Sequence, residues 1–277
     1  MTLIDIERQV LEGAKLFESV NGAPWKDPRF RMVEDDGRNF MRRDPRPSFD
    51  VIISEPSNPW MTGAASLFTR EFFTIAKQRL RTGGFFVQWL QIYEMDPVRI
   101  RSLLKTFHSV YPHVLVFSAH RDSNDLLLVG GDQLFQIDAE RFRETFESVA
   151  YDLDRADLHS PEELLALLLI SEKEIETLDA PINTDDNAFV EFGAPEDLVT
   201  YAEKDPDVDF LDVLAGDRQA LLRRVFVVPA GSTFDWLADL SRGYLRQGLL
   251  DDVIGIAHAI RTEGPTSPAL ERAKASE

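Results

Sequence analysis

The chain has 277 residues, enough for one large domain or two smaller ones, and 44% of them are hydrophobic. Its 48 acidic residues outnumber 30 basic ones, and the resulting net charge of −18 repels nucleic-acid phosphates and favours cationic small molecules. Cysteine is absent, which excludes disulfides and thiol catalysis, and the five histidines lack metal-ligand spacing. We therefore expect no metal and no nucleic-acid partner.

The sequence shows no signal for membrane insertion or export. No stretch approaches the ~20 apolar residues of a membrane span. The first residues lack a basic region followed by an apolar one, which a secretory signal would need. We therefore expect a cytoplasmic protein without a membrane span.

Residues 3–7 alternate between apolar and acidic types and predict the end of a strand, with a helix over 7–20. A carboxylate at that position can accept strong hydrogen bonds from both hydroxyls of a ribose. We choose Asp5 for this role, with Glu7 second. Glu7 also suits a helix N-terminal acid, which the helix dipole favours.

Residues 29–33 predict the next strand, followed by three acids and a glycine and then a helix over 38–43. At such a strand end, Asp36 could accept a hydrogen bond from an adenine amino group, and Gly37 would let the backbone approach the ring. Asp36 could equally cap the helix. The two roles are compatible.

The stretch 49–60 predicts the central strand of a sheet. Its apolar run is typical of a strand buried on both faces, and Pro56 and Pro59 force a turn after it. Glu55 would then lie at the carboxyl end of the strand, where open α/β sheets bind ligands. The alternative is a solvated loop acid.

A helix capped by Ser66 is predicted over 66–80, and a buried strand over 85–90. Gln88 and Gln91 could line the crevice, although Gln88 could equally be a core amide. A helix over 96–110 and an antiparallel hairpin of strands 113–119 and 125–129 at one sheet edge complete the pattern. The order predicts an α/β fold of the methyltransferase-like, Rossmann-like kind, with a mostly parallel sheet.

The second half of the chain differs. Helices are predicted over 138–150 and 160–178, a short strand over 188–192, and an acidic linker over 195–212. A helix pair from 233 onward, around Gly248, looks like one tetratricopeptide-type (TPR-like) unit, followed by a disordered tail after 264. We expect three parts: a Rossmann domain over 1–135, a helical extension over 136–195, and a linker with a helical tail over 196–277.

Residues 1 to about 130 resemble the polyamine aminopropyltransferases, the family of spermidine and spermine synthases. They are most similar to a bacterial branch often fused to membrane or helical-repeat segments. The resemblance lies in the motifs at 4–7, 27–29, 36–37, 49–59, 66–73 and 83–89, and the Asn-Thr-Asp-Asp at 183–186 belongs to the same branch. The first βα unit of the fold, with its glycine-rich turn, has no counterpart, so we expect an N-terminally truncated domain.

The resemblance implies binding of decarboxylated S-adenosylmethionine and attack by an amine on the carbon beside the sulfonium. It implies that Asp5 holds the ribose, that Asp36 holds the adenine, and that Glu55 removes a proton from the amine. Asn58 stands where the family has a second, diamine-binding aspartate. A small-molecule amine is the implied substrate, with a homodimer or an upstream segment as a possible partner.

Two alternatives stay open at this point. The chain could be a methyltransferase that uses S-adenosylmethionine on another acceptor bound by the turn after Glu55. It could also be a non-catalytic scaffold, which the missing glycine-rich turn favours. The acids at successive strand ends favour an enzyme.

Overall fold

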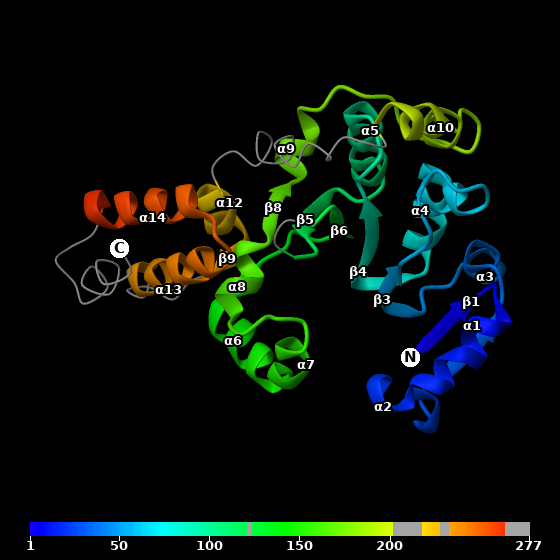
Figure 1. The fold of residues 1–277 in the computed structure, drawn as a ribbon, viewed down its shortest axis with the longest axis horizontal. Helices are drawn as coiled ribbons and strands as arrows, with labels where there is room; N and C mark the ends of the chain where they lie inside the picture. Colours follow the sequence, from blue (N-terminus) through cyan, green and yellow to red (C-terminus); the bar gives the residue numbers. More distant parts are fainter. Residues whose placement is uncertain (121–122, 202–217, 228–232, 264–277) are drawn as a thin grey trace.

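A five-stranded sheet forms the centre of the molecule, in the order β3-β4-β6-β5-β8 (Figure 1). The computed structural model describes the chain except for residues 121–122, 202–217, 228–232 and 264–277. The elements that build the sheet and its first covering layer are β3 (Phe49–Ser54), η3 (Ala64–Phe68, a 3₁₀ helix), α4 (Arg70–Gln78), β4 (Leu80–Gln91), α5 (Pro97–His108), β5 (His113–Ser118) and β6 (Asp125–Gly131).

Most strands of this sheet point the same way. β3 and β4 pair in parallel, and β6 lies antiparallel between β4 and β5, so β5 runs in the direction of β3 and β4. This is the expected Rossmann-like α/β fold. The predicted β5–β6 hairpin is confirmed, but its place at the sheet edge is wrong, because β8 (Leu168–Ser171) pairs beyond β5 and takes that edge.

The first 43 residues form a separate two-stranded parallel sheet with its own helices. The helix predicted over 7–20 is broken into three short pieces, which end where Gly22 adopts a left-handed conformation with φ 71°. The elements are β1 (Thr2–Asp5), α1 (Arg8–Gly13), η1 (Ala14–Phe17), α2 (Glu18–Asn21), η2 (Pro24–Lys26), β2 (Arg31–Glu34) and α3 (Gly37–Arg43).

The main core lies between the sheet and the helices α4 and α5, and aromatic rings dominate it. The rings of Phe73 and Phe107 lie 5.1 Å apart at 83°, and Phe107 and Tyr111 lie 4.8 Å apart. Phe86 on β4 packs between them from the sheet. Gly130 on β6 makes room for these rings, because a Cβ there would lie 2.6 Å from Phe107.

A second core covers the opposite face of the sheet over β5 and β8. The predicted helix over 160–178 is wrong in its middle, where residues 168–171 form β8. Leu168 packs in this second core, whereas Ile170 packs in the first, so the strand buries side chains on both faces. The surrounding elements are β7 (Ile137–Asp138), α6 (Ala139–Ser148), α7 (Ala150–Asp154), α8 (Pro161–Ala166), α12 (Arg218–Val225) and β9 (Phe226–Val227). Helix α9 (Glu172–Glu176) packs against α5 instead, where Ile175 joins the first core.

The strand predicted over 188–192 is also wrong, because these residues begin the helix α10 (Phe189–Tyr201). Asn187 Oδ1 accepts a hydrogen bond from the Phe189 amide, and Asn183 Oδ1 accepts one from the Val190 amide. These side chains satisfy the free amides of the first helical turn. The helix also replaces the first part of the linker expected over 195–212; residues 202–212 lie outside the described part of the chain.

The helix pair predicted from 233 onward is confirmed as α13 (Thr233–Arg246) and α14 (Leu250–Glu263), which pack against each other. Helix α13 also packs on α8 and so docks on the sheet. Its relation to tetratricopeptide units and the three proposed domain boundaries stay predictions. Among the described residues, none of the helices combines the length and apolar character that a membrane crossing requires.

Candidate active site

Glu55 directly follows β3 and lies on the surface. The strand register pairs Ser54 with Gln88 of β4, so Glu55 projects at the carboxyl end of two neighbouring parallel strands. Within the described residues, its carboxylate makes no hydrogen bond or ion pair. The Glu55 carboxylate is thus free to bind an ammonium group of a ligand or to accept a proton from it.

Gln88 is a buried amide with one unsatisfied atom. The side chain is 1% exposed, and its Nε2 donates to the carbonyl oxygens of Trp89 at 2.9 Å and Ser54 at 3.4 Å. Its Oε1 is buried and has no partner in the described part of the chain, and the same holds for Oε1 of Gln91. Buried acceptors without a donor call for a ligand or an ordered water. Gln88 is therefore a core amide that has one unsatisfied acceptor within the described part of the chain.

Asn58 lies in the loop after Glu55 and belongs to a small aromatic cluster. Its Nδ2 donates to the Tyr93 hydroxyl at 3.2 Å, and the rings of Trp60 and Tyr93 meet edge to face at 5.7 Å. The sequence analysis did not single out Tyr93 or Trp60. In the sequence, the signal for these two residues was that each follows shortly after a predicted strand; the structure shows that the two strands are neighbours.

Asp5 and Glu7 both take part in local hydrogen bonds. Asp5 Oδ1 accepts from the Glu7 amide at 2.8 Å, and its carbonyl accepts from the Asp35 amide at 3.0 Å. The second contact places Asp5 beside the turn that follows β2. Glu7 caps α1 by accepting from the Gln9 amide at 3.2 Å, which supports its interpretation as a helix N-terminal acid.

Asp36 caps α3, as one of its two interpretations anticipated. Its Oδ1 accepts from the Asn39 amide at 2.6 Å. Gly37 is the first residue of the helix, and a Cβ added there would meet no atom within 4 Å. The backbone at Gly37 is therefore open to the close approach of a flat ligand such as an adenine ring.

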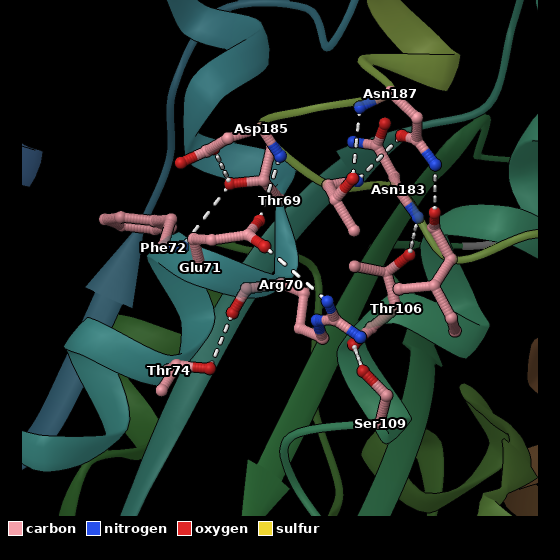
Figure 2. A network of polar contacts seen from close by, with 12 residues as sticks. Thr69, Arg70, Glu71, Phe72, Thr74, Thr106, Ser109, Asn183, Asp185 and Asn187 are labelled. Atoms are coloured by element: carbon pink, nitrogen blue, oxygen red, sulfur yellow. Dashed lines mark hydrogen bonds and ion pairs between the residues drawn. The ribbon is translucent and has the colours of Figure 1, made fainter.

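A network centred on Asp185 joins the starts of α3 and α4. Both guanidinium Nη atoms of Arg38 bind Asp185, one of them at 2.9 Å. Thr69, the N-cap of α4, donates to the same carboxylate at 2.7 Å (Figure 2). These bonds, led by the Arg38 contact, hold the pKa of Asp185 below its usual value. Because α3 follows β2 and α4 follows β3, the carboxyl ends of β2 and β3 lie at the same edge.

Asn183 anchors this network in the core. The side chain is 2% exposed, and its Nδ2 donates to the Phe68 carbonyl at 3.1 Å. Its backbone amide donates to Thr106 of α5 at 2.7 Å (Figure 2). A cavity of about 200 Å³ lies beside the network, lined in part by Arg38, Asp185 and Glu191. The Asn-Thr-Asp-Asp motif at 183–186 therefore helps to hold the starts of α3 and α4 together at this edge.

The structure groups the predicted site residues in two sets. Asp5, Glu7, Asp36 and Gly37 lie at the ends of β1 and β2, and Glu55, Asn58 and Gln88 lie at the ends of β3 and β4. No hydrogen bond or ion pair joins the two sets within the residues that the structure describes. Over the same residues there is no group of His, Asp or Glu side chains suited to a metal ion.

Comparison with known proteins gives one consistent result. Residues 1–121 match the family model "Spermine/spermidine synthase domain". Polyamine aminopropyltransferase 2 of Pseudomonas aeruginosa is 33% identical over 121 residues, which cover 42% of this chain and 34% of that protein. The polyamine aminopropyltransferase of Escherichia coli is 38% identical over 88 residues, or 31% of this chain and 30% of that protein.

Two solved structures align with part of the chain. A spermidine synthase in complex with the transition-state analogue AdoDATO aligns at 22% identity and a TM-score of 0.42, covering 48% of this chain and 46% of that one. A probable spermidine synthase from Corynebacterium glutamicum aligns at 22% identity with a TM-score of 0.39, covering 48% of each chain. The chain spans about a third of the length of the curated relatives it matches.

Proposed function

Because residues 1–121 belong to the spermine/spermidine synthase family, we propose that this chain acts in aminopropyl transfer. The donor is decarboxylated S-adenosylmethionine, and the acceptor is a small-molecule amine. The observation that supports this reaction best is Glu55, a carboxylate at the carboxyl end of β3 that has no hydrogen-bond or ion-pair partner among the described residues.

In this reaction the protein has two main tasks, which are to position the two substrates and to remove a proton from the amine. The amine nitrogen attacks the aminopropyl carbon bonded to the sulfonium, the carbon–sulfur bond breaks, and its electron pair stays on sulfur as neutral methylthioadenosine. The attacking nitrogen loses a proton, which Glu55 accepts. A protonated amine is no nucleophile, so a carboxylate that binds the ammonium and takes its proton promotes the reaction. The sulfonium supplies the activation.

The other predicted residues would hold the reactants. Asp5 keeps one carboxylate oxygen for ribose hydroxyls, with Glu7 next to it, while Asp36 and Gly37 offer an acceptor and open backbone to the adenine. Gln88 Oε1 and Asn58 Oδ1 would accept from the amine. Because Asp5, Glu7 and Asp36 already cap local structure, we expect the chain alone to bind methylthioadenosine weakly.

The test is to incubate the chain with decarboxylated S-adenosylmethionine and a panel of primary diamines. Release of methylthioadenosine is then measured by mass spectrometry. We expect Glu55→Gln to lower turnover by at least ~100-fold, as loss of a general base does. The matched control is Asp50→Asn, which removes an exposed carboxylate from the other end of the same strand. Unchanged turnover in Glu55→Gln would remove Glu55 from its role, and no turnover with any diamine would contradict the proposed reaction.

A further inference from the structure

Helix α10 belongs to the part of the chain beyond residues 1–121, which match the family model. In its first turn, the Val190 amide donates to Asn183, two residues before Asp185. About two turns further on, Asp197 reaches the loop that joins β4 to α5. Figure 1 shows α10 beside α5, and the two helices pack against each other. One helix is therefore bonded both to the Asn-Thr-Asp-Asp motif and to the loop after β4.

Asp197 forms a buried ion pair with Arg99 of α5. The two side chains are 4% and 12% exposed, and Arg99 Nε donates to Asp197 Oδ2 at 2.5 Å. The guanidinium also lies 5.3 Å from the centre of the Phe189 ring. Gly193 makes room for it, because a Cβ there would lie 2.1 Å from Arg99 Cζ. Buried ion pairs add little net stability, and their best-attested role is to fix one arrangement of the packed elements.

The same carboxylate holds the loop over residues 92–96, between β4 and α5. Asp197 Oδ2 accepts a hydrogen bond from the Asp96 amide at 3.0 Å. Asp96 ends this loop and is the N-cap of α5, where its own carboxylate accepts from the Val98 amide at 2.7 Å. One oxygen of Asp197 thus ties both the last residue of the loop and the first turn of α5 to α10.

The middle of this loop is constrained and contacts the candidate site. Glu94 has a φ of 56°, which lies in the left-handed region that a residue other than glycine keeps only where surrounding contacts impose it. The preceding residue, Tyr93, accepts a hydrogen bond from Asn58 Nδ2 at 3.2 Å. An amide whose nitrogen is bound in this way has a fixed orientation. The Tyr93 hydroxyl therefore leaves Asn58 Oδ1 for an incoming amine.

We propose that Asp197, paired with Arg99, is a positioning residue for the acceptor amine. It fixes the end of the loop, the loop places Tyr93, and Tyr93 orients the amide of Asn58. This inference rests on the reaction proposed for Glu55, and it gives a helix beyond the family match a part in that reaction. Donor binding and proton transfer to Glu55 do not depend on these contacts, so loss of the ion pair should weaken binding of the amine alone.

The first test is hydrogen–deuterium exchange of the full chain and needs no substrate. We expect Asp197→Asn to speed exchange in residues 92–96 by at least ~10-fold, to speed it less in residues 58–61, and to leave β6 unchanged. The matched control is Glu162→Gln, which neutralises a buried carboxylate of α8 that pairs with Arg143 of α6. Unchanged exchange in residues 92–96, or an equal change in both variants, overturns the proposal.

A second variant separates the loss of the contact from the cost of an isolated charge. Asp197→Asn leaves the Arg99 guanidinium buried without its carboxylate, which could unfold the chain. Asp197→Asn combined with Arg99→Gln removes both charges together. We expect this double variant to remain folded by circular dichroism and to show the same faster exchange in residues 92–96. Wild-type exchange in the folded double variant would overturn the proposal.

The kinetic test uses decarboxylated S-adenosylmethionine with diaminobutane as the amine. Asp197→Asn should raise the KM for the diamine by about 10-fold and leave kcat and the KM for the donor within about 2-fold. Tyr93→Phe should raise the same KM, and combining the two changes should add nothing, because both act through one contact. Additive effects, or a fall in kcat alone, contradict the positioning role. If the wild type turned over no amine, the proposed reaction would fail, and exchange in residues 92–96 would still decide whether Asp197 holds the loop.

Discussion

The five-stranded sheet and the two-stranded unit at the start of the chain are stabilised by different forces. In the large sheet, inner strands pair on both sides and rings such as Phe86 and Phe107 pack in a closed core. In the small unit, Leu3 and Val10 remain exposed. Only its last helix reaches the main core, through Met41 and Phe40 among the described residues, and polar bonds from Arg38 and Arg79 complete the attachment. Apolar burial therefore dominates one region, while specific polar bonds position the other.

The largest expected effect comes from a cavity in the aromatic core. Phe86 lies within about 6 Å of Phe72, Phe73, Phe107 and Tyr111, so Phe86→Ala removes packing that cannot collapse easily. We expect a loss of about 3–5 kcal/mol in the free energy of unfolding, measured by urea denaturation. Val51→Ala on the uncovered face should cost less than about 1 kcal/mol. Similar costs would mean that the two regions are equally buried.

Overpacking the same core should have the next largest effect. A Cβ at Gly130 would lie 2.6 Å from Phe107 and 2.7 Å from Tyr111, so Gly130→Ala should destabilise the protein by about 1–3 kcal/mol. The matched control is Gly13→Ala in the small unit, where φ is −61° and a Cβ meets nothing within 4 Å. We expect that change to be neutral or slightly stabilising in thermal denaturation. If Gly13→Ala destabilised the protein, the space around Gly13 would be more tightly packed than the structure shows.

Local sequence signals predicted part of this fold, and pairing between distant segments determined the rest. The central strand and the helices after it follow from local signals: an apolar run, prolines and capping side chains. The predicted cap was one turn early, because Thr69 rather than Ser66 caps α4. The signals failed at 168–171, where the Ser160 start correctly predicts a helix but pairing with β5 overrides the helix propensity of leucine. Pairing partners distant in sequence are not encoded in a local pattern.

The candidate site was predictable to the same extent. That acids follow strands was readable from the sequence, and Asp5 and Glu55 lie at strand ends as expected. The competing local role was also readable for Asp36, which caps its helix. The contact between Arg38 and Asp185 was not readable, because 147 residues separate the two side chains.

The ion pair between Arg38 and Asp185 should hold the small unit against the rest of the chain. Asp185→Asn removes the charge that Arg38 needs, at a partly buried site, and should cost about 1–2 kcal/mol in unfolding free energy. Hydrogen exchange should rise in residues 31–43 and stay unchanged in residues 80–91. The control is Asp44→Asn, which breaks an exposed local pair with Arg46. Equal exchange in both variants would show that Asp185 does not hold the small unit in place.

The smallest effect concerns the pH dependence of that ion pair. Arg38 keeps the pKa of Asp185 lower in the folded chain than its ordinary value near 3.8, so the folded state favours the charged form. Its stabilisation is fully present above the unfolded pKa and is lost as the pH falls through the folded pKa. The stability difference between the wild type and Asp185→Asn should thus be constant above about pH 5 and shrink below about pH 4. Subtracting the variant removes the titration of the other carboxylates that both proteins share. A difference that stays constant down to pH 3 would mean that the Asp185 charge contributes nothing, and that the small unit is held by uncharged contacts such as the one between Arg79 and the Met41 carbonyl.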